Sequence, residues 1–596
     1  METCILSRQD VCIKDHINRC LNIVRDFLKD ETDEKLKQVA EISVVLHDFG
    51  KFTTYYQKFV RKQKMDFDEK LKQHALISAL YSYFCLSQTD LKDYAIFSYL
   101  AIKRHHTNPK EFIEELIFDD QIIRKQVDAI QEEKFEAFLE EINISEDWKK
   151  LLSFKENKNK FLEWLENWTD VYLNESDRVV NDIESSDNDV AKLKNFFLFQ
   201  YIYSLLLDTN ETEKETEEKA KVELQTSTSS YLTDIRNQAF QEVLENFEEN
   251  LEKNIDKKIF SITLPTGLGK TNIGLAVANK LKEQSPSSTI IYAVPYTTQI
   301  TVWNSDFIII SFDELLKIIT MPSKINSRYF HKLKNAIVIL DEVQGISYRY
   351  WLAVGTIIQH LADYFNTRFI LMSAVKSTLA CKQTELANRE YFEKLDRYTA
   401  YLNYEPQTIN EFAETITIDD DKTYLFILNT EEASKKMLNV LQKKYPNKQI
   451  GFFSGKEALE DILKCNVVIS TPVIENFDVD FDVVYRDIGS FPAMILSSGK
   501  TNRNARREKG EFYVVVLVDD KKREYILHRY STIERQETFR VLENKKETMT
   551  EKEMYSLIDK YFEYLSKTSS PDTSKKFLEM LSMLGYQEDI SFCIYD

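Results

Sequence analysis

Glycine is scarce in this sequence: the chain has 12 glycines among 596 residues, and none between Gly50 and Gly267. Soluble proteins average about 7% glycine. β-Sandwiches, propellers and collagen-like chains depend on this residue, because it enters left-handed turns without strain. The shortage therefore argues against these architectures in the first half of the chain. It favours long helices, which need little glycine.

Cysteine pairs and membrane-length apolar runs are also missing. The seven cysteines include no C-x-x-C pair, so we expect buried free thiols in a reducing cytoplasm. The N-terminus METCILSRQD has no hydrophobic signal core, and the longest apolar run, residues 196–207, is too short to cross a bilayer and contains Gln200. We expect a soluble cytoplasmic protein with no membrane partner.

The chain is acidic, with 97 Asp and Glu side chains against 78 Lys and Arg side chains and a formal net charge of −19. Such a surface argues against indiscriminate binding of polyanions, although a local basic channel can coexist with it. Candidates for such a channel are Arg503, Arg506 and Arg507, in the stretch NRNARR. At about 150 residues per domain, the length predicts about four domains.

Two sequence patterns divide the chain. Up to about residue 207, apolar residues recur every three or four positions, as in HINRCLNIVRDFL, which predicts helix after helix. Residues 208–230 are acidic and polar, and predict a linker or an exposed helix. From about residue 258, short apolar runs alternate with helical segments, which predicts parallel sheets with crossover helices. These runs are IFSITL, TIIYAV, DFIIIS, AIVIL, RFILM, YLFIL, QIGFF, NVVIS and FYVVVLV, and they fit two lobes with a boundary near residues 395–420.

A cluster of histidines with one carboxylate marks the helical part. Five of the eight histidines lie in the first 106 residues, and Asp48 directly follows one of them. Imidazole with carboxylate suits Mn, Fe, Co or Ni, and hydrolysis of a phosphodiester needs metals that activate water and neutralise the phosphate. We predict one or two such metals, with His47, Asp48 and Lys51 as catalytic residues, since Lys51 lies one helical turn on and can meet a phosphate oxygen. The metal ligands expected from the residues are His47, Asp48, His74, His105 and His106.

These residues resemble the HD phosphohydrolase domain in its CRISPR-associated nuclease form. The resemblance implies that His16 is a further, early metal ligand. It also implies an aspartate on a late helix, in a segment like Ser-Leu-Leu-x-x-x-Asp. Residues 203–210 read YSLLLDTN, so that Asn210 stands at this position and Asp208 lies two residues earlier. Either residue is a candidate for completing the site.

A phosphate-binding loop opens the second part. The strand run IFSITL is followed by the loop PTGLGKT and by the helical stretch NIGLAVANKLK. A glycine-rich turn between strand and helix points backbone N–H groups at a phosphate. Lys270 is expected to reach the β- and γ-phosphates of ATP, and Thr271 to hold Mg²⁺. The predicted nucleotide-binding residues are Pro265, Thr266, Gly267, Leu268, Gly269, Lys270 and Thr271.

An acidic pair follows a later buried strand. The run AIVIL ends in Asp341 and Glu342, about seventy residues after the loop. A carboxylate at a strand end can hold Mg²⁺, and the next carboxylate can orient the attacking water. We therefore predict Asp341 and Glu342 as catalytic residues for ATP hydrolysis.

The loop PTGLGKT resembles motif I of superfamily 2 helicases. Together with the HD region and the sequence DEVQ, it makes most of the chain resemble the CRISPR-associated Cas3 nuclease-helicases. Further stretches fit the same family: residues 231–236 (YLTDIR), 371–375 (LMSAV), 428–430 (LNT), 470–480 and 499–503 (GKTNR). The last stretch implies that Arg503 binds the nucleotide.

The resemblance implies a multidomain fold: an all-α HD domain followed by two RecA-like α/β lobes and a small helical C-terminal region. The expected boundaries are 1–215 for the HD domain, 216–230 for a linker, 231–395 and 396–520 for the lobes, the second one shortened, and 521–596 for the C-terminal region. The implied function is a metal-dependent single-stranded DNA endonuclease and exonuclease fused to an ATP-dependent DNA helicase. It would degrade invader DNA in type I CRISPR interference, recruited by an RNA-guided surveillance complex (Cascade).

Several motor positions depart from the family. Val375 replaces Thr, Pro472 replaces Gln, Phe477 replaces Gly and Lys500 replaces Arg. Lysine cannot reproduce the bidentate fork of arginine on a phosphoryl group. Two connections, after Gln299 and after Gly455, are also short.

Two alternatives follow. One is a nucleotide-binding, motor-defective variant that acts only as an HD nuclease or docking module. The other is an HD phosphohydrolase for nucleotides beside an unrelated ATPase, which the order and spacing of the motifs disfavour.

Overall fold

The computed structural model describes residues 4–110, 119–211, 230–253, 256–295, 306–376, 379–455, 457–543, 545, 547–568 and 570–585. By their contacts the residues group into two compact units. Unit 1 comprises Met1–Glu217 with Glu314–Lys334 and Lys576–Ile590, and unit 2 comprises the remainder. The expected linker 216–230 lies, but for residue 230, outside the described residues, as does Gln299 after β4.

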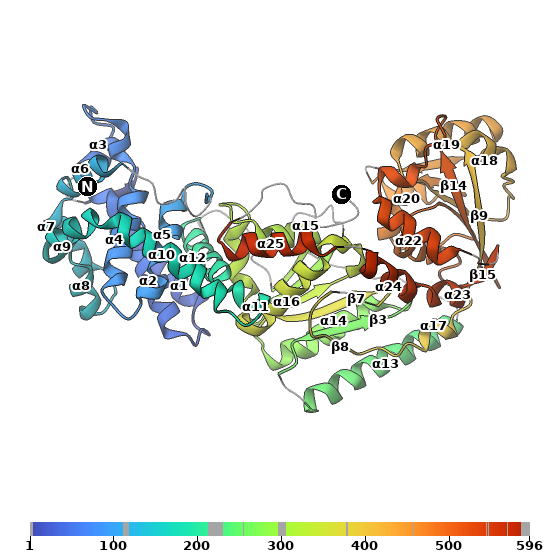
Figure 1. The fold of residues 1–596 in the computed structure, drawn as a ribbon, viewed down its shortest axis with the longest axis horizontal. Helices are drawn as coiled ribbons and strands as arrows, with labels where there is room; N and C mark the ends of the chain where they lie inside the picture. Colours follow the sequence, from blue (N-terminus) through green and yellow to red (C-terminus); the bar gives the residue numbers. More distant parts are fainter. Residues whose placement is uncertain are drawn as a thin grey trace. The chain divides into compact units, whose positions relative to one another are not determined.

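Unit 1 is helical, with a short hairpin before the first helix (Figure 1). The hairpin pairs β1 (Leu6–Arg8) with β2 (Val11–Cys12). The helices that surround the histidines are α1 (Ile13–Phe27), α2 (Glu34–Leu46), α4 (Ala75–Ser87), α5 (Ala95–Arg104) and α12 (Lys194–Glu211). Between α2 and α4 lie η1 (Phe49–Phe52), α3 (Thr54–Val60) and η2 (Glu69–Lys72), and α6 (Asp120–Asp128) to α11 (Asp189–Lys192) precede α12. Every residue from Ile77 to Leu86 of α4 is buried, because other elements cover all of its faces.

The hairpin corrects one expectation from the sequence. Cys4 and Cys12 form a disulfide, with their Cα atoms 6.1 Å apart. The expectation of free thiols is therefore wrong for this pair, because the turn between β1 and β2 brings the two residues together. Cys20, Cys85, Cys381 and Cys465 are free, as expected.

A segment from the middle of the chain completes unit 1. Most of α15 (Phe312–Thr320) and all of η5 (Ser327–Leu333) follow β5 in sequence, yet belong to unit 1 and pack there against α12. Gln200 donates to the carbonyl of Ile318, 3.2 Å away. Arg328 Nε donates to Asp208 at 2.8 Å, and both side chains are largely buried.

Lobe 1 of unit 2 is a six-stranded parallel sheet in the order β5-β4-β6-β7-β3-β8. Its strands are β3 (Ile259–Thr263), β4 (Ile290–Val294), β5 (Phe307–Ser311), β6 (Ile337–Leu340), β7 (Arg368–Ser373) and β8 (Thr384–Glu385). The helices α13 (Ser230–Lys253), α14 (Lys270–Gln284) and α16 (Trp351–Phe365) accompany it. Strands β3 and β6 are buried along their whole length, which explains their unbroken apolar sequences.

Lobe 2 is a seven-stranded sheet in the order β11-β12-β10-β13-β14-β9-β15, parallel except for β15. Its strands are β9 (Tyr398–Thr408), β10 (Tyr424–Ile427), β11 (Ile450–Phe453), β12 (Val467–Ser470), β13 (Val483–Asp487), β14 (Gly510–Val518) and β15 (Thr548–Thr550). Helices α18 (Ile409–Thr415), α19 (Glu431–Lys444), α20 (Leu459–Ile462) and α21 (Phe491–Ser498) belong to the same lobe.

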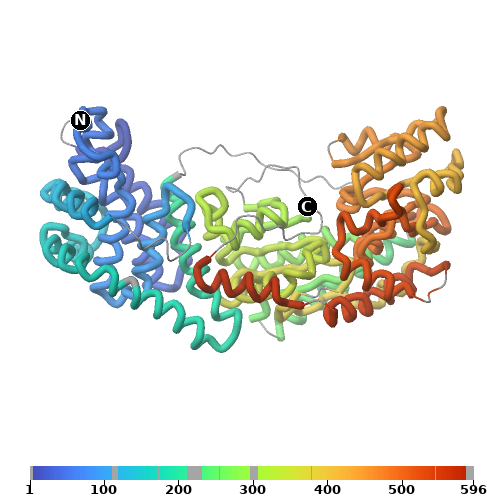
Figure 2. The backbone as a smooth tube through the Cα atoms, turned by 45° about the horizontal axis from the view of Figure 1, so that its top comes forward, coloured from blue at the N-terminus to red at the C-terminus, as the bar shows by residue number. Residues whose placement is uncertain are grey.

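The C-terminal region as far as α24 (Ile558–Thr568) packs as part of lobe 2. Figure 2 follows the chain from β14 through α22 (Thr532–Leu542) and β15 to α23 (Glu551–Ser556) and α24, which lie beside this lobe. Strand β15 extends its sheet, and residues of α23 and α24 enter its apolar core. The last described helix is α25 (Asp572–Ser582).

The nine strands expected from the sequence all coincide with observed strands, and the predicted change from helices to parallel sheets is confirmed. Strands β1, β2, β8, β9, β13 and β15 were not expected. In the part of the chain that the structure describes, no helix combines the length and apolar character needed to cross a bilayer.

The packing of η5 on α12 gives a first prediction. Arg328→Ala leaves the Asp208 carboxylate buried without its guanidinium partner, and such a loss typically costs about 3 kcal/mol. We expect faster hydrogen exchange of the α12 amides, measured by mass spectrometry. Ile325→Ala, in the same segment but at a side chain that is 82% exposed, is the matched control. Unchanged exchange in Arg328→Ala would show that this ion pair does not hold α12.

Candidate metal centre and nucleotide site

The Asp48 carboxylate is the centre of a buried histidine cluster in unit 1. Its Oδ2 lies 3.5 Å from Nε2 of His16 and 3.5 Å from Nε2 of His47. Its Oδ1 lies 3.3 Å from Nε2 of His74 and 4.0 Å from Nε2 of His105. Each oxygen of this one carboxylate thus faces two imidazoles.

His106 joins this cluster, with its Nε2 3.1 Å from Nε2 of His74. The ligand atoms form two groups, and within each group they lie within 4.8 Å of one another. The first group is His16, His47 and Asp48, and the second is His74, His105 and His106. The structure therefore brings together all six residues that the sequence analysis named, including His16.

Backbone contacts orient two of the rings. His47 ends α2 and its Nδ1 donates to the carbonyl of Val44 at 2.7 Å, while His105 ends α5 and its Nδ1 donates to the carbonyl of Ile102 at 2.6 Å. A carbonyl can only accept, so in the neutral ring the proton sits on Nδ1 and the Nε2 lone pair faces Asp48. Metal-binding histidines are held in this way.

Gly50 allows the motif to approach α4. A Cβ at this position would lie 2.5 Å from the carbonyl oxygen of His74, so no other residue fits without a shift of the backbone. The Gly50 amide donates to Ser78 of α4 at 2.8 Å. Phe49 stacks on Tyr81, also of α4, with ring centroids 4.3 Å apart, so that two neighbouring residues contact the same helix.

Burial keeps the imidazoles neutral. It lowers the pKa of His16 to about 3, that of His74 to about 4 and that of His106 to about 3. Burial raises the pKa of Asp48, but His47 and Lys51 outweigh it and hold this pKa well below its ordinary value. Neutral imidazoles around a charged carboxylate are the protonation states that metal binding requires.

Two buried atoms of the cluster lack a hydrogen-bond partner among the described residues, namely Oδ1 of Asp48 and Nε2 of His105. Such atoms are rare in folded proteins and usually indicate a missing ion or water. The two atoms lie 4.0 Å apart. The donor set therefore fits one or two transition metals.

Lys51 and Ser7 contact the same carboxylate. Lys51 Nζ lies 2.8 Å from Asp48 Oδ2 and donates to Ser7 Oγ at 3.2 Å, and Ser7 Oγ donates to Asp48 at 3.1 Å. Ser7 comes from β1, and no motif in the sequence marked it. The expected contact of Lys51 with a phosphate oxygen stays a prediction.

The end of α12 approaches the cluster at Thr209, whose carbonyl accepts from Cys20 Sγ at 3.4 Å, while the same sulfur lies 3.9 Å from His16 Nδ1. Asp208 instead bonds Arg328 and lies 3.5 Å from Nε2 of His331. It therefore serves the packing of η5. A role of Asn210, which is half-buried, in the metal centre stays a prediction.

A cavity of about 390 Å³ lies between the two lobes of unit 2. Lobe 1 contributes the phosphate loop and both residues of the acidic pair, and lobe 2 contributes residues of two other motifs. The predicted residues that line it are Thr266, Gly267, Gly269, Lys270, Thr271, Asp341, Glu342 and Arg503, and Phe477 and Lys500 line it too. Pro265 and Leu268 are not among its lining residues, and Leu268 is buried in the core of lobe 1.

The phosphate loop has the geometry that its sequence predicts. Gly267 and Gly269 have φ angles of 89° and 79°, in the left-handed region that favours glycine. Helix α14 begins at Lys270, so its first amides point into the cavity. Lys270 Nζ lies 3.3 Å from the carbonyl of Leu264 and 3.3 Å from Glu342.

The acidic pair lies at the carboxyl end of β6. Tyr292 donates to Asp341 Oδ2 at 2.5 Å, and Asp341 Oδ1 is buried without a partner among the residues described. Burial and the neighbouring Glu342 raise the pKa of Asp341. Burial also raises the pKa of Glu342, but Lys270 outweighs it, so this pKa is lowered. These two carboxylates supply the oxygen ligands and negative charge that suit Mg²⁺.

Lobe 2 brings two cations to the cavity. Lys500 is buried, and its Nζ donates to the carbonyl of Phe477 at 2.5 Å. Burial, with the nearby charge of Arg503, lowers the pKa of Lys500 to about 7. Arg503 pairs with Asp478. Position 500, where lysine replaces the arginine of the family, therefore still presents an amine to the cavity.

Arg397 connects the phosphate loop to the C-terminal region. Its buried guanidinium donates to the carbonyl of Thr266 at 2.9 Å and to Glu551, the first residue of α23, at 3.1 Å from Nε. Both side chains are almost fully buried. Arg236 adds a second contact to the loop, to the carbonyl of Gly267 at 2.7 Å. Neither Arg397 nor Glu551 stood in a sequence motif.

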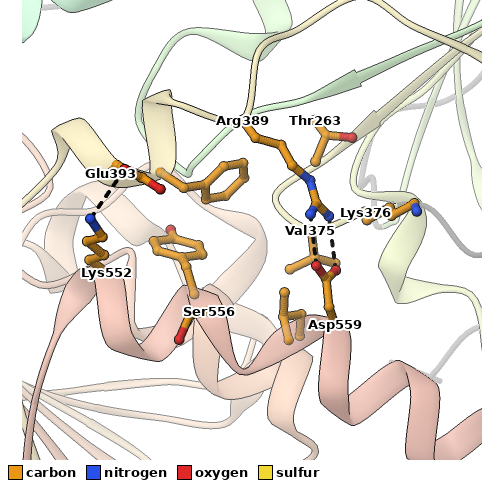
Figure 3. A pocket seen from close by; sticks show the side chains of 11 residues that line it. Thr263, Val375, Lys376, Arg389, Glu393, Lys552, Ser556 and Asp559 are labelled. Carbon is orange, nitrogen blue, oxygen red and sulfur yellow. Dashed lines mark hydrogen bonds and ion pairs between the residues drawn. The ribbon is translucent and has the colours of Figure 1, made fainter.

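A second cavity, of about 170 Å³, lies where α23 and α24 meet lobe 1 (Figure 3). Arg389 donates twice to Asp559 of α24, at 2.9 and 3.0 Å, and Lys552 of α23 lies 3.3 Å from Glu393. Val375 lines this cavity and packs in the apolar core of lobe 2. The methyl groups of Val375 therefore pack in the apolar core together with residues of α23 and α24.

Comparisons with known proteins relate the chain to one group of enzymes. Residues 231–349 match the family described as type III restriction enzyme, res subunit. The curated CRISPR-associated nuclease/helicase Cas3 of Haloferax volcanii is 23% identical over 57% of this chain and 45% of its own, so the chain spans just under half the length of that relative.

Solved structures share the fold. Structures of T. fusca Cas3, alone and with ATP, match with TM-scores of 0.57 each at 12% identity. The matches cover 97% and 95% of this chain, and 83% and 81% of the T. fusca chains. The helical region followed by two parallel-sheet lobes is therefore a shared architecture.

The buried histidines give a prediction about pH. Because the pKa values of His16, His74 and His106 lie at about 3 to 4, protons compete with metal only below about pH 4. We expect Mn²⁺ affinity, measured by calorimetry, to stay within about twofold from pH 8 to pH 5.5 and to fall steeply below pH 4. Asp48→Asn should bind at least about tenfold more weakly, and the exposed Asp120→Asn should not. An affinity that already falls at pH 6.5 would contradict a buried neutral site.

The contact between Arg397 and Glu551 gives a prediction about nucleotide binding. Glu551→Gln leaves a buried guanidinium without its counter-charge, which loosens the loop carbonyl of Thr266. We expect a fluorescent ATP analogue to bind about tenfold more weakly, by anisotropy titration. Glu563→Gln, on the exposed face of α24, is the control. Equal affinity in both variants would separate the ion pair from nucleotide binding.

Proposed function

We propose that unit 1 is an HD-type metal-dependent nuclease and that the two lobes form an ATP-dependent superfamily 2 DNA helicase, as in the Cas3 nuclease-helicases that the chain resembles in its motifs, its curated relative and its fold. Together they degrade single-stranded invader DNA in type I CRISPR interference, in the cytoplasm, after recruitment by the RNA-guided surveillance complex Cascade. The observation that carries the proposal is the Asp48 carboxylate, whose two oxygens face histidines of both candidate ligand groups, in a chain that also has a cavity lined by the phosphate loop and the acidic pair.

In the nuclease, the residues supply a preorganised ligand cage. His16, His47 and Asp48 would hold one metal, and His74, His105 and His106 a second. Bound metals lower the pKa of the attacking water and neutralise the phosphate. Asp48 shares its two oxygens between the groups, and Lys51 keeps its ammonium beside this carboxylate.

In the motor, lobe 1 binds the phosphates and lobe 2 completes the cavity. The amides of the loop and Lys270 would hold the β- and γ-phosphates, Thr271 and Asp341 would hold Mg²⁺, and Glu342 would orient the attacking water. Arg503 and Lys500 present positive charge from lobe 2. Charge at this place stabilises the transferring phosphoryl group.

The motor-defective alternative remains a second candidate, favoured by one observation. Lys500 supplies only a point charge, and its pKa of about 7 leaves part of the population uncharged at neutral pH. The ATPase assay distinguishes the two candidates. We expect DNA-stimulated ATP hydrolysis that Lys270→Ala abolishes and that Lys500→Ala lowers at least about tenfold.

Lys500→Arg is the informative variant in this assay. It restores a permanent charge, so it should retain turnover and remove any dependence of the rate on pH near 7. Absence of stimulated turnover in both the parent chain and Lys500→Arg would leave only the nuclease. The nuclease is tested by cleavage of single-stranded DNA with Mn²⁺, Co²⁺ or Ni²⁺. Asp48→Asn must abolish this cleavage, and Lys270→Ala must not.

A further inference from the structure

A basic segment separates two of the ligand-bearing elements. Residues 54–72, which we call the basic arm, comprise α3, a turn and η2, and end two residues before His74. The arm carries six basic side chains against three acidic ones, in a chain whose formal net charge is −19. The six are Lys58, Arg61, Lys62, Lys64, Lys70 and Lys72. A local reversal of charge beside a phosphodiester site is the electrostatic footprint of a nucleic-acid path.

A row of aromatic rings leads from the surface of the arm to the metal centre. Phe59 is 42% exposed, an unusual position for a phenyl ring. Its centroid lies 6.0 Å from that of Tyr56, and the Tyr56 ring lies 5.2 Å from the ring of His74. Tyr56 is held in place by its hydroxyl, which donates to the carbonyl of Ser7 at 2.6 Å. One ring therefore separates the exposed Phe59 from a metal ligand.

Cations accompany these rings. Lys72 Nζ lies 4.7 Å from the centre of the Phe59 ring, and Lys58 Nζ lies 6.0 Å from the centre of the Phe67 ring. Phe67 in turn lies 4.9 Å from Tyr55, ring to ring. Phe59 and Phe67 thus each have an ammonium group beside the ring. Single-stranded nucleic acids are bound by such surfaces, because bases stack on the rings and phosphates meet the cations.

The charges of the arm are available to a ligand. Lys62 has a φ angle of 55° and marks the turn after α3, and both Lys62 and Lys64 are exposed. Within the described ranges, neither forms an ion pair with an acidic side chain. Lys58 and Lys72 pair with acids at 3.4 Å at the surface, and exposed pairs contribute about 0–1 kcal/mol. Phosphates can therefore replace these partners at little cost.

We propose that the basic arm is the surface that holds single-stranded nucleic acid as it enters the metal centre. Phe59 stacks a base, and Lys62 and Lys64 bind the phosphates on its flanks. This inference rests on the proposed nuclease function, in so far as it names where the substrate of that centre is held. A base on Phe59 would place the following phosphodiester toward Tyr56 and His74.

Crosslinking of the full chain tests the contact. A short single-stranded oligonucleotide that carries 5-iodouracil is irradiated with the protein, and the modified peptide is identified by mass spectrometry. We expect the crosslink within residues 54–72, and at least a fivefold loss in Phe59→Ala. Leu173→Ala, at another exposed apolar side chain of unit 1 (53%), should leave its yield unchanged.

Kinetics test the consequence for cleavage. Lys62→Glu/Lys64→Glu should raise the KM for single-stranded DNA at least about tenfold and reduce the slope of log KM against log salt by about 1.4, the value for two phosphates on a single strand. Lys160→Glu, at an exposed lysine elsewhere in unit 1, is the charge control. The Mn²⁺ content of each variant must equal that of the parent chain, which shows that the metal centre is intact.

The outcomes separate this inference from the proposed function. A parent chain that cuts DNA, with arm variants of unchanged KM and crosslinks elsewhere, would overturn the role of the arm and leave the nuclease standing. Crosslinks in the arm without any cleavage would instead refute the nuclease alone. Crosslinks that only an acidic peptide such as polyglutamate displaces, and unlabelled DNA does not, would identify the arm as a protein-docking surface and overturn the proposal.

Discussion

A buried charge is stable only when opposite charge or directed dipoles meet it, since an isolated ion loses several kcal/mol of hydration. This constraint organises both units. Asp48 is tolerated in the interior of unit 1 because Lys51, Ser7 and the imidazoles surround it. Arg397 is tolerated between the lobes because Glu551 reaches it from α23. In each case the compensation draws distant segments together, and the functional residues lie where they meet.

Many of the residues that the sequence identified belong to short motifs of neighbouring positions, whereas the more distant histidines were identified by their residue type and clustering. His47 and Asp48 are adjacent, and the loop from Thr266 to Thr271 works through consecutive amides, so a linear pattern contains the chemistry. Ser7, Arg397 and Glu551 act across tens to hundreds of positions, and only the folded chain shows their partners. No local pattern distinguishes Glu551 from the other glutamates of a charged C-terminal region.

The same reasoning explains why the sequence did not predict strands β9 and β13. Strand β9 reads YTAYLNYEPQT, and its polar residues and Pro406 hide a segment that pairs on both sides, with β14 and β15. Strand β13 contains Arg486 and Asp487, which are buried and paired inside lobe 2. Charged residues in a central strand conceal it from hydrophobicity patterns, because the compensating groups lie on other elements. The apolar strands β3 and β6 posed no such difficulty.

Three of the residues that depart from the helicase motifs, Val375, Phe477 and Lys500, make packing or hydrogen-bond contacts of their own in the structure. Phe477, which replaces glycine, packs edge-on against Phe453 with centroids 5.3 Å apart, and its carbonyl accepts from Lys500. Val375, which replaces threonine, enters the apolar core that α23 and α24 complete. The substitutions are therefore mutually consistent and do not read as independent losses.

The segment of η5 that covers α12 has a consequence for the modularity of the protein. It lies in sequence between two strands of lobe 1, yet it supplies Arg328, Phe330 and His331 to the helical unit. A gene fragment that ended before lobe 1 would encode a helix bundle that lacks η5 on α12 and the guanidinium of Arg328 beside Asp208. The helical unit thus cannot be separated from lobe 1 by cutting the chain once. An evolutionary lineage that carried them as separate polypeptides would first have to resurface α12.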